Sequence, residues 1–123
     1  MLSKLKQKNN IRVKSVRKKT AARIAAVQVL YISRINEIDV LSAKHDYLTN
    51  YQKFILTKLK IKKIDIDLLN EIILYVENNI KKIDSFISDN LSNKWKIERL
   101  SLTELNIIRL SVYELCVSSS FDS

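Results

Sequence analysis

Residues 16–35 read VRKKTAARIAAVQVLYISRI, and this stretch decides the class of fold that the sequence predicts. Positions along it recur at intervals of three or four residues, which is the spacing of one face of an α-helix. That face consists of Val16, Thr20, Ile24, Val27, Tyr31 and Ile35. Four alanines, at positions 21, 22, 25 and 26, are interleaved with it. Because small residues let neighbouring segments approach closely, we predict a helix that is packed on several sides along its second half.

The same periodicity continues through the rest of the chain. A second apolar face comprises Tyr47, Leu48, Tyr51, Phe54, Ile55 and Leu59, and a third comprises Leu68, Leu69, Ile72, Ile73, Val76, Ile80, Ile83 and Ile87. Asp65 and Asp67 are predicted N-caps of the third segment. The connections are expected at residues 36–42, 60–64 and 90–93. Because there is no alternating strand pattern and the chain lacks Gly and Pro, the sequence predicts an all-α bundle.

Positive charge is concentrated at the N-terminus. The first 36 residues hold ten Lys and Arg and no Asp or Glu, and the remaining 87 hold twelve basic and thirteen acidic residues. The net charge of +9 is therefore local, which favours a polyanionic partner. We divide the chain into a basic flexible tail over residues 1–11, a helical domain over 12–117 and a polar end over 118–123.

Several classes of protein are disfavoured. No window of 18 apolar residues exists, so no membrane span is expected, and the N-terminus lacks the apolar core of a secretory signal. An organellar transit peptide is less favoured, because the basic residues run directly into a helix pattern. A single cysteine, Cys116, fits a reducing, cytoplasmic setting. The single histidine, His45, is too little for a nucleophilic or metal site, and a chain without Gly has no Gly-rich phosphate loop. We therefore expect no catalytic residues, no metal and no cofactor, and a protein that is not an enzyme.

The last segment is apolar on all sides when it is wound as a helix. Its apolar residues are Leu100, Leu102, Leu105, Ile107, Ile108, Leu110, Val112, Leu115 and Val117. Such a helix needs cover all round, yet only six residues follow Val117. We expect either a partner chain, including a possible homodimer, or a domain that continues beyond this sequence.

Two stretches resemble the NusB family. The first, RKKTAARIAAVQVLY at residues 17–31, is similar to the opening helix of that family, where a basic cluster leads into a run such as A-x-Q-x-L-Y. The second, IDSFISDNLSNKWKIERLSLTELNIIRLSVYEL at residues 83–115, is similar to a later signature of the family. The two occur in the expected order and together cover about half of the residues.

The resemblance implies a small helical transcription antitermination factor. NusB-like proteins bind the single-stranded boxA element of nascent ribosomal RNA, within the bacterial elongation complex, together with the small-subunit ribosomal protein NusE. By position, the resemblance places RNA contacts on Arg17, Lys18, Lys19 and Arg23, and NusE contacts on Tyr31 and Glu104. Clustered cations of this kind neutralise phosphates, and the absence of acids nearby in sequence argues against a merely solvated helix face. A structural role in the core competes evenly with partner contact for Tyr31, and Glu104 has a surface role as its alternative.

Departures from the family pattern give rival interpretations. After Tyr113-Glu114-Leu115 the family continues with segments such as V-x-I-N-E-A and F-V-N-G-V-L, which form its last two helices, and this sequence has neither. Tyr75 is bulky where a small residue is expected. We therefore expect a NusB-like antiparallel bundle without those helices, of marginal stability, oligomeric or inactive by itself. The alternatives are the NusB-like RNA-binding module of ribosomal RNA cytosine methyltransferases and an inactive fragment of a decayed gene.

Two further residues have structural interpretations. Trp95 is predicted to pack between helices. Arg109 lies within an apolar run and is predicted to form an ion pair, with Glu98, Glu104 and Glu114 as candidate partners.

Overall fold

A computed structural model describes residues 2–92 and 95–117, and within them the side chains from Arg17 onward. These residues form six α-helices and one 3-10 turn, with no strand, which confirms the predicted all-α class. The helices are α1 (Leu2–Asn36), α2 (Val40–Asn50), α3 (Gln52–Leu59), α4 (Ile66–Asn78), α5 (Ile80–Asn90) and α6 (Leu102–Cys116), with the 3-10 turn η1 at Ile97–Arg99.

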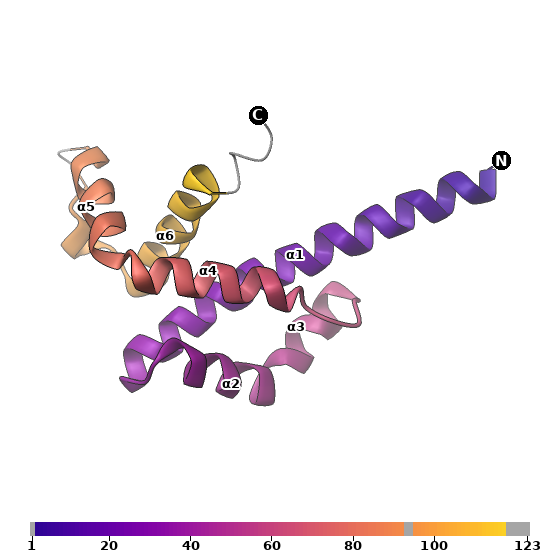
Figure 1. Cartoon of the computed structure of the whole chain (residues 1–123), viewed down its shortest axis with the longest axis horizontal. Coiled ribbons are helices and arrows are strands. Elements are labelled where there is room, and N and C mark those ends of the chain that lie inside the picture. The colour runs from indigo at the N-terminus through magenta and orange to yellow at the C-terminus, as the bar shows by residue number, and fades with distance from the viewer. Residues whose placement is uncertain (1, 93–94, 118–123) are drawn as a thin grey trace.

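The second half of α1 lies at the centre of the bundle. It contacts α2 and α3 on one side and α4 and α6 on the other, as Figure 1 shows. Ala21, Ala22, Ala25, Ala26 and Val29 are all fully buried. The predicted packing on several sides is therefore confirmed, because the small alanine side chains let four neighbouring helices approach α1 closely.

The first half of α1 projects beyond the other helices (Figure 1). We expected a flexible tail over residues 1–11, but the backbone of residues 2–11 is helical and continuous with the rest of α1. No Gly or Pro interrupts this segment, and Lys, Leu and Gln are good helix formers. The use of residues 12 and 117 as domain limits stays a prediction, and residues 118–123 lie outside the described part.

Two of the helical segments predicted from the sequence are each divided. The segment from Tyr47 to Leu59 breaks at Tyr51, and the segment from Leu68 to Ile87 breaks at Asn79. Both break residues have a φ of −123° with ψ near zero, which bends the chain without a loop. The Asn79 side chain donates a hydrogen bond to the carbonyl of Tyr75 over 2.9 Å, so it satisfies an end of α4. The apolar periodicity passes through both bends and gives no sign of them.

Side chains cap the helix starts. Asp39 accepts a hydrogen bond from the Ser42 N–H over 2.8 Å, and Asp65 accepts one from the Leu68 N–H over 3.0 Å, as predicted for Asp65. At α6, Ser101 and Glu104 form a reciprocal capping box. In the absence of Gly, two turns use Glu37 and Lys60 in the left-handed region, with φ of 54° and 55°, each at a cost of about 1 kcal/mol.

One side of α6 remains exposed. Its inner side places Val112, Tyr113, Asn106 and Arg109 against the bundle, whereas Ile107 is 50% exposed and Leu115 is 67% exposed. A helix that is apolar all round is thus packed by α1, α4 and α5 on one side only. Tyr75, the bulky residue of α4, contacts Tyr113 edge-on, with ring centroids 5.4 Å apart.

Candidate nucleic-acid interface and partner surface

The predicted RNA-binding cations lie on α1 where this helix leaves the bundle. Arg17 and Lys19 are exposed and Lys18 is half-buried. The carbonyl of Lys18 accepts a hydrogen bond from the N–H of Asp65, the N-cap of α4, over 3.3 Å. This bond fixes the backbone of Lys18 against the start of α4. Among the described residues, none of these three cations forms an ion pair. Their charges are therefore available to a ligand.

Arg23 differs from the other three cations. Its Nε donates a hydrogen bond to Oε1 of Glu114 over 2.6 Å, and this ion pair joins α1 to α6. The two side chains are 36% and 28% exposed, so the pair is only partly screened from water. No acid is near the basic cluster in sequence, but the fold brings Glu114, which is 91 residues away, into contact with Arg23.

Helix α1 lines a cavity of about 450 Å³ near Tyr31 and a smaller one, of about 360 Å³, beside Arg23. It is lined by Lys19, Arg23, Asp65, Asp67, Leu68, Glu71 and Tyr113. Burial, followed by the negative charge of Glu71 and a hydrogen bond with it, raises the pKa of Tyr113 to about 12. The phenol is therefore neutral at ordinary pH. The cavity thus mixes positive and negative groups, but Arg23 is the one cation of the four that forms an ion pair among the described residues.

A second group of cations lies where the sequence predicts only a helix end and a connection. Lys58, Lys60, Lys62 and Lys63 are all exposed and lie at the end of α3 and in the turn that follows. The run KLKIKK at residues 58–63 is visible in the sequence. Its position relative to Arg17–Lys19 depends on how α3 packs, which periodicity does not report.

Tyr31 lies at the rim of the 450 Å³ cavity, together with Val27, Gln28, Ile32, Tyr47, Tyr51 and Thr103. Its side chain is 42% exposed, so it is not a core residue. Tyr47 beside it is 1% exposed, and its hydroxyl has no hydrogen-bond partner in the described structure. Burial raises the pKa of Tyr47. The cavity thus offers aromatic walls and a phenol.

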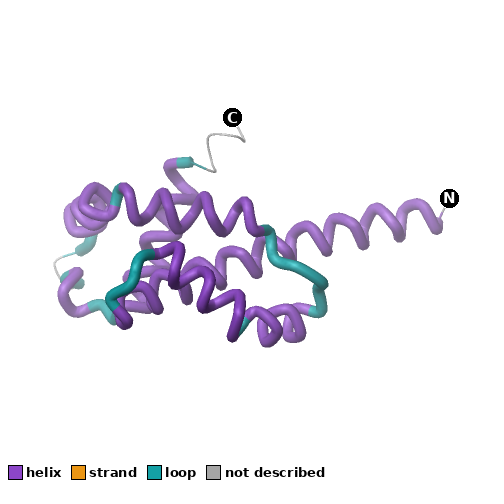
Figure 2. The backbone as a smooth tube through the Cα atoms, turned by 60° about the horizontal axis from the view of Figure 1, so that its bottom comes forward, coloured by secondary structure: helices purple, strands orange, loops and turns teal. Residues whose placement is uncertain are grey.

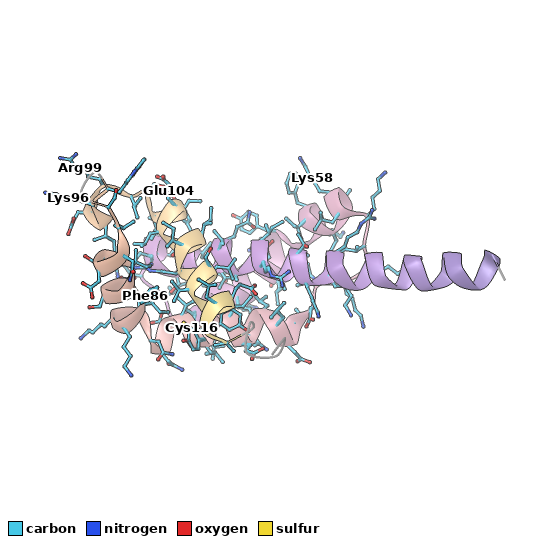
Figure 3. The ribbon with its side chains drawn as sticks, turned by 90° about the horizontal axis from the view of Figure 1, so that it is seen from above. Lys58, Phe86, Lys96, Arg99, Glu104 and Cys116 are labelled. Atoms are coloured by element: carbon cyan, nitrogen blue, oxygen red, sulfur yellow. The ribbon has the colours of Figure 1, made fainter. Side chains whose placement is uncertain are left out.

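Glu104 is exposed and forms part of the α6 capping box. Hydrogen bonds from the backbone and side chain of Ser101 lower the pKa of Glu104. The adjacent Thr103 lines the cavity beside Tyr31, so the start of α6 and the middle of α1 contribute to one region. Figure 3 shows Glu104 well apart from Lys58, so this region and the lysine-bearing turn face different parts of the molecule.

Arg109 forms a structural ion pair, but with a different residue from those predicted. Its Nε and Nη2 donate to the two carboxylate oxygens of Asp84 over 2.9 and 2.8 Å, and its Nη1 donates to Asn106 over 3.0 Å. The predicted partners Glu98, Glu104 and Glu114 are therefore wrong. The bidentate pair attaches α6 to α5, and Arg109 is 9% exposed.

Trp95 does not pack between helices as predicted. It is 61% exposed and lies in the connection between α5 and η1. The described residues contain no group of three or more potential metal-binding side chains, and no helix among them is long and apolar enough to cross a membrane.

Comparison with known proteins identifies the family. Residues 20–122 match the NusB family. A protein named Transcription antitermination protein NusB from Clostridium botulinum (strain Alaska E43 / Type E3) is 37% identical over 94 residues, which are 76% of this chain and 65% of that protein. The protein of the same name from Clostridium novyi (strain NT) is 31% identical over 94 residues, with the same coverage of 76% and 65%.

A shorter match is closer in sequence. The protein of that name from Clostridium botulinum (strain Loch Maree / Type A3) is 51% identical over 55 residues, 45% of this chain and 38% of that protein. The chain thus spans at most 65% of the length of these relatives. No solved structure matches significantly. Since the family match covers most of the sequence and agrees with the all-helical architecture, this chain belongs to the NusB family.

Proposed function

We propose that this chain is a transcription antitermination factor that binds boxA-type single-stranded RNA of nascent ribosomal RNA. It does so in the transcription elongation complex together with a NusE-type ribosomal protein. The observation that carries the proposal is the match of residues 20–122 to the NusB family, whose relatives bear the antitermination name. The matched region begins after Lys19, so Arg17, Lys18 and Lys19 directly precede it.

The chemistry of Arg17, Lys18 and Lys19 suits RNA. Exposed cations that have no acidic partner release counterions when they neutralise phosphates, and the resulting affinity falls with salt. Arg23 supports the same surface differently: Glu114 engages its Nε, and the remaining N–H groups of its guanidinium are left for phosphate. We propose that this ion pair orients Arg23 toward the strand.

The surface around Tyr31 and Glu104 suits a protein partner. A half-exposed tyrosine at an aromatic-walled cavity provides apolar contact with a polar end, a combination common in interfaces. Glu104 adds an exposed negative charge near its rim, which favours a basic partner such as a ribosomal protein. The RNA and partner surfaces lie on different parts of α1, so both ligands can bind at once.

Binding of a boxA-type RNA and of a scrambled RNA of equal length tests the proposal, with and without the NusE-type protein. We expect preference for the boxA-type strand, and stronger binding when the partner is present. Tyr31→Ala is expected to remove the effect of the partner while leaving RNA binding by the chain alone unchanged. Equal affinity for both RNAs under all conditions would refute the specific function.

The triple variant Arg17→Gln, Lys18→Gln, Lys19→Gln tests the RNA surface. Three lost phosphate contacts should reduce the slope of log affinity against log salt by about 2. The matched control is Lys81→Gln, Lys82→Gln, Lys96→Gln, which removes the same charge from exposed positions of α5 and the η1 connection. An equal loss in both triple variants would show that net charge, rather than this surface, governs binding.

A further inference from the structure

The turn that follows α3 has a defined backbone conformation and carries exposed lysines. Lys60 ends α3 in the left-handed conformation, and its N–H donates to the carbonyls of Leu56 and Thr57. The next N–H, of Ile61, donates to the carbonyl of Leu56 over 3.1 Å. These bonds satisfy the last carbonyls of the helix and fix the start of the turn.

Apolar residues hold this turn to the bundle. Ile64 is 2% exposed, and Ile61 is half-buried against the core. Lys60, Lys62 and Lys63 alternate with these anchors and are exposed, as is Lys58 one turn earlier in α3. The ammonium groups are therefore carried by a backbone that is already ordered.

The turn lies beside the basic segment of α1. The Asp65 N–H donates to the Lys18 carbonyl over 3.3 Å, and α3 itself packs on α1. Figures 1 and 2 both show the turn at the end of the bundle from which α1 projects. Two segments about 40 residues apart in the sequence thus place exposed cations at the same end of the molecule.

An aromatic ring accompanies these lysines. Phe54 of α3 is 65% exposed, and the Lys58 Nζ lies 5.1 Å from the centroid of its ring. A ring next to cations is the combination that binds an unpaired base and its phosphate. The segment Arg17–Lys19 itself contains no aromatic residue.

We propose that Phe54, Lys58, Lys62 and Lys63 form a second contact surface for the single-stranded RNA, continuous with Arg17–Lys19. Phe54 stacks on one unpaired base, and the lysines neutralise the phosphates that follow. Over residues 58–67 four lysines face two carboxylates, Asp65 and Asp67, and Asp65 is occupied in capping α4. In the described part of the chain, none of these lysines forms an ion pair. The inference rests on the proposed function and extends its RNA site.

The charge arm of the test uses Lys58→Gln, Lys62→Gln, Lys63→Gln in the whole chain, which leaves the left-handed Lys60 intact. With a single-stranded RNA of about 12 nucleotides, we expect affinity to fall about tenfold at low salt, and the salt slope to fall by about 2. The control is again Lys81→Gln, Lys82→Gln, Lys96→Gln, at the opposite end, where Figure 3 labels Lys96. Wild-type affinity and slope in the turn variant, or the same loss in the control, would overturn the proposal.

The stacking arm uses Phe54→Ala, with Phe86→Ala of α5 as its control, since Phe86 is 50% exposed. Loss of one stacked base should weaken binding roughly fivefold or more, with the salt slope unchanged. Circular dichroism verifies that both variants are folded. A Phe54→Ala variant that binds like wild type would remove Phe54 from the surface.

The two proposals fail separately. If the Arg17–Lys19 variant loses RNA affinity and the turn variant does not, the RNA function stands and the second surface is refuted. If wild type binds the strand no better than it binds duplex RNA of equal charge, stacking on unpaired bases is refuted. If wild type binds no RNA, the proposed function itself fails.

Discussion

The two halves of α1 share one continuous helix but are built for opposite surroundings. Between Ala21 and Val29 the helix is lined by alanines that are fully buried under four other helices. Around Arg17 and Lys19 it carries exposed cations, and toward the N-terminus it leaves the bundle (Figure 1). The same backbone therefore anchors the fold at one end and presents charge at the other.

This contrast shows how a small bundle keeps a charged surface rigid. Cations on a loose chain lose conformational freedom when they bind, and that loss weakens affinity. Here Arg17–Lys19 are held on a helix that is fixed by its buried half. Arg23 marks the boundary, because it reaches out of the buried half to Glu114 on α6.

The largest expected effect comes from enlarging a buried alanine. Ala25→Leu should destabilise the chain by about 3 kcal/mol, because overpacking forces neighbouring helices apart. Urea denaturation measures the change. The control, Gln28→Leu on the exposed side of the same helix, should stay within about 0.5 kcal/mol of wild type. Similar values for both variants would contradict the central packing of α1.

Tyr113, which shares the cavity at the boundary with Arg23, should give the next largest effect. Burial raises its folded-state pKa to about 12 from the ordinary value of 10.0, so its contribution to stability is complete below pH 10 and is lost as pH rises from about 10 to 12. The total is about 2.7 kcal/mol, because one unit of pKa corresponds to about 1.4 kcal/mol.

Urea denaturation of wild type and Tyr113→Phe between pH 8 and pH 12 measures this contribution. Stability of the wild type should fall more steeply over the upper part of that range, since the variant cannot ionise at this position. Parallel curves would show that Tyr113 is not held neutral by burial and Glu71.

A smaller effect on stability is expected at Arg23. Arg23→Gln removes the ion pair with Glu114 and should cost about 0.5–1 kcal/mol, since both side chains are partly exposed. Arg17→Gln should leave stability unchanged while weakening RNA binding. If both variants behave alike in urea, the boundary between the two halves of α1 lies elsewhere.

Local features were predictable from the sequence because they depend on near neighbours. The stripe from Val16 to Ile35, the buried alanines and the cap at Asp65 all follow from spacings of three or four residues. The breaks at Tyr51 and Asn79 were missed, because apolar periodicity continues across them. Periodicity also gives no helix over residues 2–11, where the backbone is helical; the flexibility expected of residues 1–11 stays a prediction.

The sequence by itself determined the all-helical class, the acid-free N-terminal segment and the apolar character of α6. Only the tertiary structure decided which charges meet: Arg23 with Glu114, Arg109 with Asp84, and the Lys58–Lys63 turn beside Lys18. Helical periodicity reports which side chains share one face of one helix. Pairs that are 25 or 91 residues apart depend on how helices bend and cross, and that is set by the packing of the whole core.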